Sequence, residues 1–303
     1  MTTVRFVLHG KQALNPAVRA AVLAVRAAGH RVDVRVTWEA GDATRLAEEA
    51  SREGFERVAA GGGDGTINEV AAGLLAARTG SSRGPALCII PLGTANDFAH
   101  ACQIPLEPSA ALQLATTATP RPIDIGRVAG RPFINMATGG FGTRITVETR
   151  PELKRALHGA AYLVTGLTHL AELRAEKVTV TGPDLSWSGE LLVLAVGNGR
   201  QAGGGHVLAP EARIDDGLLD LGILPDVPHG ERADALGRLL RDGKTELWRH
   251  AVTARLPWVE LTAPEPLQIN LDGEPISGEK LRFEVLAGAL DACLPETAPV
   301  LRR

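Results

Sequence analysis

The stretch Arg57-Val-Ala-Ala-Gly-Gly-Gly-Asp-Gly-Thr-Ile-Asn-Glu69 decides the fold of this chain. It begins as an apolar run typical of a buried strand and ends in helical spacing, so its glycines lie where a strand turns into a helix. Consecutive glycines let main-chain N–H groups approach an anion, and a helix start adds N–H donors and the positive end of its dipole. The stretch therefore predicts a phosphate cradle in an α/β domain.

Other nucleotide-binding motifs do not fit this stretch. It has no GxxxxGK[ST] sequence, it lacks the third glycine of GxGxxG, and the chain has no HRD or DFG signature of protein kinases. Thr66 and Glu69 have the spacing of a capping box, which would fix the start of the helix. The alternative to a cradle is a tight strand-to-helix turn without a ligand.

Strand and helix signals alternate on both sides of this stretch. Helices are predicted at residues 17–28, 43–53, 67–77 and 110–116, and strands at residues 4–9, 32–36, 55–60 and 86–91. This order indicates an open, mostly parallel sheet with helices on both faces. Such a sheet binds ligands beyond the carboxyl ends of its strands.

A second polar loop, Pro91-Leu-Gly-Thr-Ala-Asn-Asp-Phe98, also follows a buried strand. Thr94 and Asn96 offer neutral hydrogen-bonding groups, and Asp97 offers a carboxylate. Loops after neighbouring strands converge on one crevice, so we expect both loops to face the same ligand. The alternative is a turn with an Asx cap.

The pattern changes to short β-like runs after about residue 122. They lie at residues 123–128, 132–137, 178–181, 190–196, 219–224, 259–262, 267–271 and 281–285. Val128-Ala-Gly130 and Asp272-Gly273 are turn signals, and one long helix is predicted near 151–173. We predict a nucleotide-binding domain over 1–124, a β-rich domain over 125–290, a tail of about 290–303 packing back on the first domain, and an interdomain cleft.

The composition excludes several classes of protein. A net charge of −3 gives no reason to expect nucleic acid as a partner. Cys88, Cys102 and Cys293 lack CxxC spacing, which disfavours disulfide and zinc frameworks and fits a reducing cytoplasm. The N-terminal residues show no export signal, and the longest uncharged run, 156–171, is too short for a transmembrane segment.

Two signatures carry a family resemblance. GGGDGTINEV (61–70) and PLGTANDFA (91–99) resemble the paired motifs of the diacylglycerol-kinase catalytic family, which includes sphingosine and ceramide kinases. RVTWEAGDA, FINMATGGFGTRIT, GNGRQAGGG, DDGLLDL and NLDGEP are similar to bacterial lipid kinases of that family, in the same order. The resemblance implies an NAD kinase/diacylglycerol kinase-like open parallel sheet followed by a mainly antiparallel β-sandwich.

The resemblance also implies the residues of the site. The segment Gly63, Asp64, Gly65, Thr66, Ile67, Asn68 and Glu69 matches the family's nucleotide contacts, together with Thr37 and Thr94. Glu274 matches the base that accepts the hydroxyl proton, and Asp64 is the second expected catalytic residue. The local sequence around Glu274 favours a solvated hairpin residue, and it is the resemblance that reverses this preference.

Two metal sites are expected. The resemblance implies one built from the Asp216 side chain and the main-chain carbonyls of Arg213 and Leu218, holding Mg²⁺ or alternatively Ca²⁺. A separate hypothesis places Asp64, Asp97 and Asp124 around one magnesium ion through water, because Mg²⁺ keeps much of its hydration. Turn or cap roles are the alternatives for all these aspartates.

The expected function is ATP-dependent phosphorylation of a lipid hydroxyl at the membrane surface by a cytoplasmic enzyme in peripheral contact. The acceptor is phosphatidylglycerol or a diacylglycerol-like lipid. The glycine-dense segments 139–142 and 197–205, the latter with Arg200, could line its pocket, and the helix near 151–173 either touches the membrane or is core. The alternatives are an NAD kinase-like soluble kinase and a nonenzymatic nucleotide sensor. The sequence does not determine the oligomeric state.

Overall fold

The structure is a computed structural model that describes residues 1–78, 84–140, 175–226, 231 and 251–302. The long helix predicted near 151–173 lies outside the described residues. The chain divides into two compact units. Unit 1 comprises residues 1–125, 213–217 and 286–303, and unit 2 comprises residues 126–212 and 218–285.

Unit 1 contains the predicted parallel sheet. Its strand order is β2-β1-β3-β4, and all neighbouring pairs are parallel. The bounds are β1 (Thr3–Leu8), β2 (Arg31–Val36), β3 (Arg57–Gly62) and β4 (Ala86–Pro91). The end of β15 (Glu274–Ala292) adds a parallel neighbour to β4, where Ala292 lies opposite Leu87. The predicted sheet is thus confirmed, and it gains one strand end from far along the chain.

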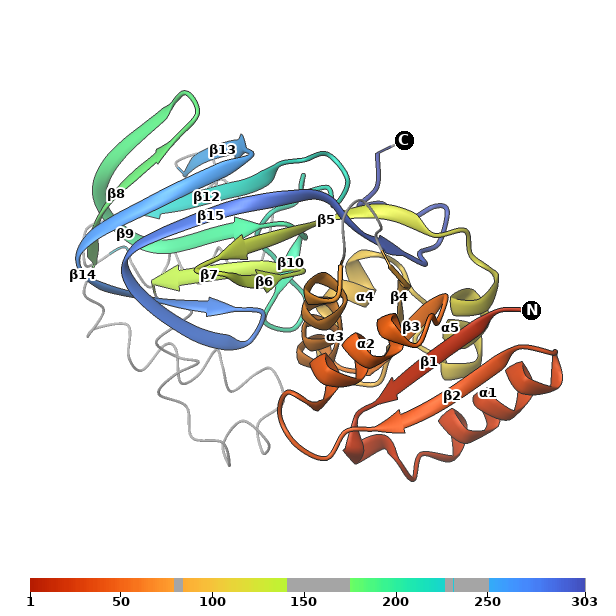
Figure 1. Cartoon of the computed structure of the whole chain (residues 1–303). Coiled ribbons are helices and arrows are strands. Elements are labelled where there is room, and N and C mark those ends of the chain that lie inside the picture. Colours follow the sequence, from red (N-terminus) through yellow and green to blue (C-terminus); the bar gives the residue numbers. More distant parts are fainter. Residues whose placement is uncertain (79–83, 141–174, 227–230, 232–250, 303) are drawn as a thin grey trace. The chain divides into compact units, whose positions relative to one another are not determined.

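Helices cover both faces of this sheet (Figure 1). The helices of unit 1 are η1 (Gly10–Gln12), α1 (Pro16–Ala27), α2 (Asp42–Arg52), α3 (Asp64–Ala76), α4 (Asp97–Ala101) and α5 (Pro108–Thr117). Val4, Phe6 and Leu8 of β1 share one apolar cluster with α1 and α5. Arg5, one residue out of phase, instead pairs with Glu53 at the end of α2, because successive strand residues point to opposite faces.

Helices α2 and α3 pack against each other through a glycine. A Cβ at Gly73 would lie under 3.0 Å from the main-chain oxygen of Thr44, so no larger residue fits. At the same contact the Thr44 hydroxyl donates to the main-chain oxygen of Glu69 over 3.0 Å. This close approach fixes α3 along its length, and with it the position of the glycine loop at its N-terminus.

Gly73→Ala should lower the free energy of unfolding by about 1–3 kcal/mol, because the added methyl group would push two helices apart. Gly65→Ala, in the first turn of the same helix, is the matched control, since a Cβ there meets nothing within 4 Å. Chemical denaturation of both variants measures the effect. Equal stability of the two variants would contradict the packing role of Gly73.

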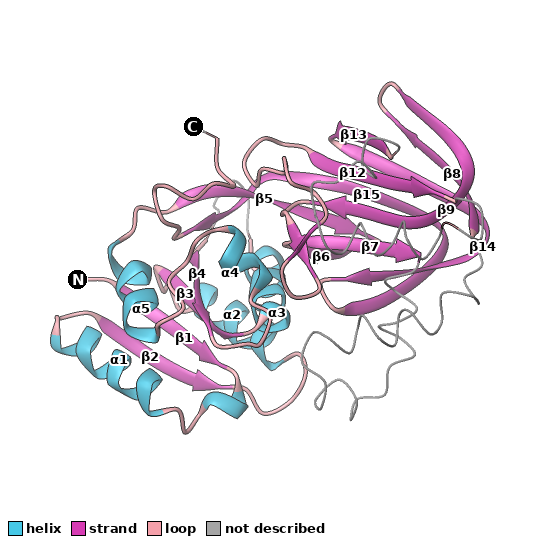
Figure 2. Ribbon diagram, turned by 180° about the vertical axis from the view of Figure 1, so that it is seen from behind, coloured by secondary structure: helices cyan, strands magenta, loops and turns pink. Residues whose placement is uncertain are grey.

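Unit 2 is built from antiparallel strands, which Figure 2 shows in magenta. Its strands are β5 (Arg121–Val128), β6 (Arg131–Phe133), β7 (Met136–Gly140), β8 (Glu176–Gly182), β9 (Leu185–Gly197), β10 (Gln201–Ala202), β11 (His206–Val207), β12 (Leu219–Pro225), β13 (Val252–Leu256), β14 (Trp258–Leu271) and most of β15. The strands β5 and β15 each contribute residues to both units.

Strands β9 and β14 connect the layers of the sandwich. Both β9 and β14 pair with β7 at one end and with β8 at the other, so each passes from one layer to the next. The layers enclose an apolar core in which the rings of Phe133 and Phe283 meet edge to face, with centroids 6.4 Å apart. The predicted antiparallel β-sandwich is confirmed.

Several element predictions need correction. The run 132–137 is two strands, β6 and β7, and 259–262 and 267–271 are one strand, β14, with a register shift between Thr262 and Leu267. The prediction did not include β13 or α4. Both turn signals are confirmed: Ala129 and Gly130 have φ of 49° and 77°, and Asp272 and Gly273 have φ of 48° and 99°. Positive φ at both central residues is the mark of a type I′ hairpin turn.

Candidate nucleotide-binding and catalytic site

The loops at the carboxyl ends of the four parallel strands are hydrogen-bonded to one another. The Gly10 N–H, after β1, donates to the Thr37 hydroxyl, after β2, over 3.2 Å. The Gln12 side-chain amide donates to the Leu92 carbonyl, after β4, over 2.9 Å, and the Leu92 N–H donates to the Gly62 carbonyl of β3 over 2.8 Å. These bonds make one preorganised surface of four loops. No local motif in the sequence marks Gln12 as part of this surface.

The glycines of the first loop have different roles. A Cβ at Gly61 would strike the Phe6 ring, and one at Gly62 would strike the Thr66 side chain, both under 3.0 Å. A Cβ at Gly93 of the second loop would strike the Cα of Gly63. Gly65 differs, because it is exposed and a Cβ there would meet nothing. Gly61, Gly62 and Gly93 therefore allow close packing within the protein, whereas Gly65 exposes its main chain to solvent.

Helix α3 begins with unusual capping. Its N-cap is Gly63, which has no side chain to accept the first N–H groups of the helix. Thr66 lies inside the first turn and is buried beneath Gly62, so the predicted capping box is wrong: the helix starts earlier than that box requires. A helix start without a side-chain cap, beside an open glycine, is a favourable place for an anion.

Asp64, the first residue of α3, joins the two glycine loops. Its carboxylate accepts the N–H groups of Asp97 and Phe98, each over 3.1 Å, at the start of α4. It therefore caps a neighbouring helix whose own N-cap, Asn96, makes no side-chain cap bond. Asn96 has φ of 50° and exchanges two hydrogen bonds with the main chain of Gly93, so its amide stabilises its own loop; the bonds run backwards along the chain, unlike those of an Asx turn.

Burial raises the pKa of the Asp64 carboxyl above its ordinary value. The nearby charge of Asp97 raises this pKa further, while the hydrogen bonds from Phe98 and Asp97 oppose the shift. The ionised carboxylate is therefore held at an energetic cost at neutral pH. A cation bound near this pair of carboxylates would offset that cost.

Asp64→Asn should change how stability depends on pH. Because the folded pKa is raised, the Asp64 contribution to stability is fully present below the unfolded pKa of about 3.9 and is lost as pH rises through the folded pKa. The variant lacks this titration. The difference in melting temperature, variant minus unsubstituted protein, should therefore increase as the pH rises from about 4 to 7. Thermal unfolding of both proteins across that range, without nucleotide, checks the sign, and a falling difference would contradict it.

The remaining predicted nucleotide contacts differ in exposure. Thr37 is half-buried and Thr94 is exposed, both at the carboxyl edge of the sheet. The Asn68 side-chain oxygen is buried and has no hydrogen-bond partner, which is costly unless a ligand satisfies it. Ile67 points into the core and its N–H donates to the Gly63 carbonyl, so it supports the helix. The Glu69 carbonyl is engaged by Thr44.

Glu274, in unit 2, follows the Asp272-Gly273 turn between β14 and β15. Its side chain is exposed. The preceding Asp272 accepts the N–H groups of Ile134, Asn135 and Met136 at distances of 2.6–3.2 Å. Sequence analysis identified Asp272 only as a turn former, because its partners lie more than 130 residues away.

The loop 213–217 is anchored within unit 1. Asp124 accepts the N–H groups of Gly217 over 2.6 Å and Gly288 over 2.7 Å. The Arg302 N–H donates to Asp215 over 2.9 Å, and the Arg302 guanidinium donates to the Asp216 carbonyl. Burial raises the pKa of the Asp124 carboxyl, and the charges of Asp216 and Asp215 raise it further against the two hydrogen bonds.

These oxygen atoms are of the kind that hard cations prefer. A carboxylate and main-chain carbonyls are ligands for Mg²⁺ and Ca²⁺, and the accumulated negative charge of Asp124, Asp215 and Asp216 favours a cation. In the described part of the chain, however, no three His, Cys, Asp or Glu side chains lie close enough to bind one metal ion. Asp64, Asp97 and Asp124 therefore do not form a direct three-carboxylate site, and a magnesium ion held by them through water stays a prediction.

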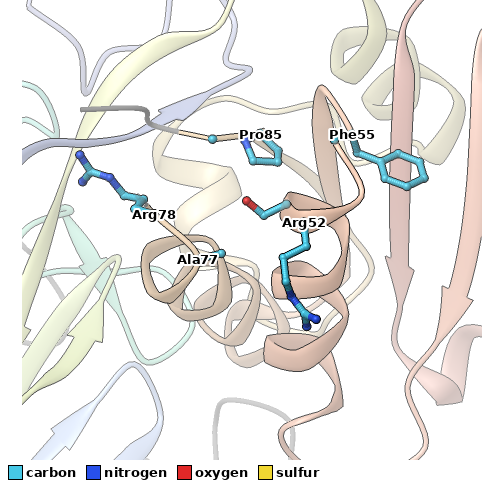
Figure 3. Close-up of a pocket in the computed structure, with 8 residues that line it drawn as sticks. Arg52, Phe55, Ala77, Arg78 and Pro85 are labelled. Carbon is cyan, nitrogen blue, oxygen red and sulfur yellow. The ribbon is translucent and has the colours of Figure 1, made fainter. Parts of the chain in front are cut away.

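A cavity of about 360 Å³ lies elsewhere in unit 1 (Figure 3). It is lined by Ser51, Arg52, Gly54, Phe55, Ala77, Arg78, Gly84 and Pro85, which places it at the amino ends of β3 and β4. The glycine loops lie at the opposite, carboxyl ends, where open parallel sheets bind their ligands. Figure 3 also shows Arg52 and Arg78 directed away from each other, so the cavity does not concentrate their charge.

The predicted lipid-binding segments are described only in part. Residues 141 and 142 of the 139–142 segment lie outside the described residues. Arg200, in the other segment, donates from its guanidinium to the Ala212 carbonyl over 2.9 Å, which anchors it within unit 2. Among the helices that the structure describes, none is long and apolar enough to cross a membrane.

Comparisons with known proteins identify the family to which the chain belongs. The diacylglycerol kinase catalytic domain matches residues 5–128, and the YegS C-terminal NAD kinase beta sandwich-like domain matches residues 138–294. A protein of Pseudomonas aeruginosa (strain UCBPP-PA14) named "Probable lipid kinase YegS-like" is 56% identical over 99% of this chain and 96% of its own length. A protein of the same name from Pseudomonas savastanoi pv. phaseolicola is 54% identical over 98% of this chain and 95% of its own.

A solved structure shows the same fold. A diacylglycerol kinase from Bacillus anthracis str. Sterne superimposes with a TM-score of 0.75 at 21% identity, covering 98% of both chains. The open sheet with paired glycine loops and the following β-sandwich thus define a kinase with a diacylglycerol-kinase catalytic domain. Within that class, the chain belongs to the YegS-like lipid kinases.

Proposed function

We propose that this kinase transfers the γ-phosphoryl group of ATP to the hydroxyl group of a lipid. The observation that carries the proposal is the surface of four cross-linked loops at the carboxyl edge of the parallel sheet, where Gly65 and the start of α3 present main-chain N–H groups without a side-chain cap. Phosphoryl transfer needs little covalent chemistry from the protein, so rigid positioning and charge stabilisation carry most of the catalysis.

The nucleotide is assigned to unit 1. Gly63, Asp64, Gly65 and Thr66 would contact its phosphates through the main chain. Thr37, Ile67, Asn68, Glu69 and Thr94 complete the proposed set. Asn68 supports this assignment best, because its buried side-chain oxygen has no partner and would gain one from a ligand donor.

A divalent cation is assigned to the Arg213 and Leu218 carbonyls and the Asp216 carboxylate. The oxygen donors fit Mg²⁺, with Ca²⁺ as the alternative at this site. When bound, a divalent cation neutralises negative charge, both in the cluster of Asp124, Asp215 and Asp216 and, near a nucleotide, on the phosphates. Asp64 would contribute by holding the two glycine loops in a fixed position relative to each other, through its hydrogen bonds from the Asp97 and Phe98 N–H groups.

Glu274 is assigned as the proton acceptor. Its carboxylate is exposed on a structured turn, so it is available to a hydroxyl group in a way that the engaged carboxylates of Asp64 and Asp272 are not. The step breaks the bond between the γ-phosphorus and the bridging oxygen, forms a bond from that phosphorus to the lipid oxygen, and moves the hydroxyl proton to Glu274. The products are ADP and a phosphorylated lipid.

The lipid is proposed to be phosphatidylglycerol or a diacylglycerol-like alcohol, reached by peripheral contact of a cytoplasmic enzyme with a membrane. Support comes from the relatives, which are named lipid kinases. Incubation with labelled ATP, Mg²⁺ and mixed micelles of each lipid alcohol, followed by thin-layer analysis, should show a labelled lipid. A label on NAD instead would identify the NAD kinase-like alternative, and nucleotide binding without any turnover would identify a sensor.

Gly65→Ala should separate binding from stability. Alanine favours a helix interior over glycine by up to about 1 kcal/mol, so the variant should be at least as stable as the unsubstituted protein. The added methyl group would occupy the space where phosphate is proposed to approach, so ATP affinity should fall about tenfold or more, a change of about 1.4 kcal/mol. Calorimetric titration with ATP and adenosine checks this, with the larger loss expected for ATP. Unchanged ATP affinity would remove Gly65 from the cradle.

Glu274→Gln should lower kcat by about 10²–10⁴-fold, the usual contribution of a general base, while ATP affinity stays nearly the same. The amide keeps the size of the side chain and loses its ability to accept the proton. The matched control is Glu279→Gln, an exposed glutamate further along β15, which should leave kcat unchanged. Normal turnover in the Glu274 variant would remove this residue from the mechanism.

A further inference from the structure

We propose that Asp272 is a positioning residue for the phosphoryl transfer: it fixes the turn that carries Glu274 by binding the main chain before β7, and it does not take up the proton itself. This inference rests on the proposed function, in which Glu274 is the base. Hydrogen exchange tests its structural part separately from activity, so that the inference and the proposed function can fail independently.

The Asp272 carboxylate is saturated with main-chain donors. One oxygen accepts the Ile134 N–H over 2.6 Å, and the other accepts the Met136 N–H over 2.7 Å. The Asn135 N–H lies 3.2 Å from both oxygens. Hydrogen bonds to an ionised carboxylate are stronger than neutral ones, and these involve three consecutive residues. Residues 134–136 lie beyond the end of the β7–β14 ladder, and their N–H groups bond to the Asp272 carboxylate instead of to a neighbouring strand.

The turn itself needs this support. Asp272 has φ of 48°, in the left-handed region that costs a residue other than glycine about 1 kcal/mol or more. Its own N–H donates to the Met136 carbonyl over 3.1 Å, so Asp272 and the β7 start bind each other in both directions. The Asn270 side chain accepts the Gly273 N–H over 2.7 Å and closes the turn from the other side. Leu271 and Glu274 then pair directly across the hairpin.

This arrangement gives the two acidic residues of the turn different chemistry. A carboxylate has about four lone-pair sites, and those of Asp272 meet three N–H donors at four short distances. Accepting a proton there would require breaking bonds that hold the turn. Within the described part of the chain, the Glu274 carboxylate has no hydrogen-bond partner, and it is exposed. Glu274 can therefore accept a proton without a structural penalty, provided that Asp272 holds it in place.

The kinetic test compares Asp272→Asn, Glu274→Gln and the double variant. Asparagine keeps the shape of Asp272 but replaces one acceptor oxygen by an NH2 group. Its kcat should fall by about 10–100-fold, by analogy with the loss of a hydrogen-bond partner that orients a metal ligand, with the KM for ATP unchanged. The fall of kcat at acidic pH that reports protonation of Glu274 should persist in Asp272→Asn and disappear from the residual activity of Glu274→Gln.

The double variant should be no slower than Glu274→Gln, because a positioning residue has nothing to position once the base is gone. A loss in Asp272→Asn of the acidic limb of the pH profile would identify Asp272 as a proton acceptor and overturn the proposal. Independent, additive losses in the double variant would also overturn it.

Hydrogen exchange supplies a readout that does not depend on activity. In Asp272→Asn the N–H groups of Ile134, Asn135 and Met136 should exchange faster, whereas in Glu274→Gln they should keep their protection. Unchanged protection in Asp272→Asn would refute the structural part even if no lipid is phosphorylated. If these N–H groups exchange faster in Asp272→Asn but the unsubstituted protein phosphorylates no alcohol, the structural role of Asp272 would be supported and the proposed function refuted.

Asn270→Ala covers the case in which Asp272→Asn does not fold. This change removes the acceptor of the Gly273 N–H and leaves both carboxylates intact. It should lower kcat relative to the unsubstituted protein, keep the acidic limb of the profile and keep the protection of residues 134–136. A kcat equal to that of the unsubstituted protein would show that the turn needs no fixation and would overturn the proposal.

Discussion

Hydrogen bonding of main-chain N–H groups to aspartate carboxylates from distant parts of the chain is the interaction on which the loops of the proposed site depend. Asp64 holds the start of α4, Asp124 holds Gly217 and Gly288, and Asp272 holds residues 134–136. Loops cannot satisfy all their own main-chain groups, and an unsatisfied buried N–H costs about as much as a lost hydrogen bond. An ionised carboxylate satisfies two or three such groups at once, with stronger bonds than a neutral acceptor makes.

This use of carboxylates carries an electrostatic cost that is relevant to function. Burial raises the pKa of both Asp64 and Asp124, and in each case neighbouring aspartates raise it further. The protein thus keeps negative charge concentrated at the carboxyl edge of its parallel sheet and at the loop 213–217. The proposed phosphoryl transfer would need cations near anionic phosphates, and such concentrations of charge would attract them. The same aspartates therefore serve the architecture and the electrostatics.

The glycines complement the carboxylates. Gly61, Gly62, Gly73 and Gly93 permit contacts too close for any side chain, with Phe6, Thr66, the Thr44 carbonyl and Gly63 respectively. A rigid helix pair and two interlocked loops follow from these contacts. Gly65 alone among the glycines of the first loop faces open space. Close packing behind the loop and a bare main chain in front of it are together what a preorganised phosphate site requires.

The sequence by itself determined the α/β domain, the β-rich second domain and the place of both glycine loops, because hydrophobic period and turn chemistry are local properties, whereas the sandwich arrangement was implied by the family resemblance. Apolar runs predicted β1, β3 and β4, and apolar–polar alternation predicted β2, each to within a few residues, and Asp272-Gly273 predicted its turn. Only the tertiary structure decided that Asp64 caps α4, that Gln12 joins the Leu92 loop and that Asp272 binds the start of β7. Those partners lie 33 to 136 residues apart, and no local pattern encodes which distant N–H group a carboxylate will meet once the chain has folded.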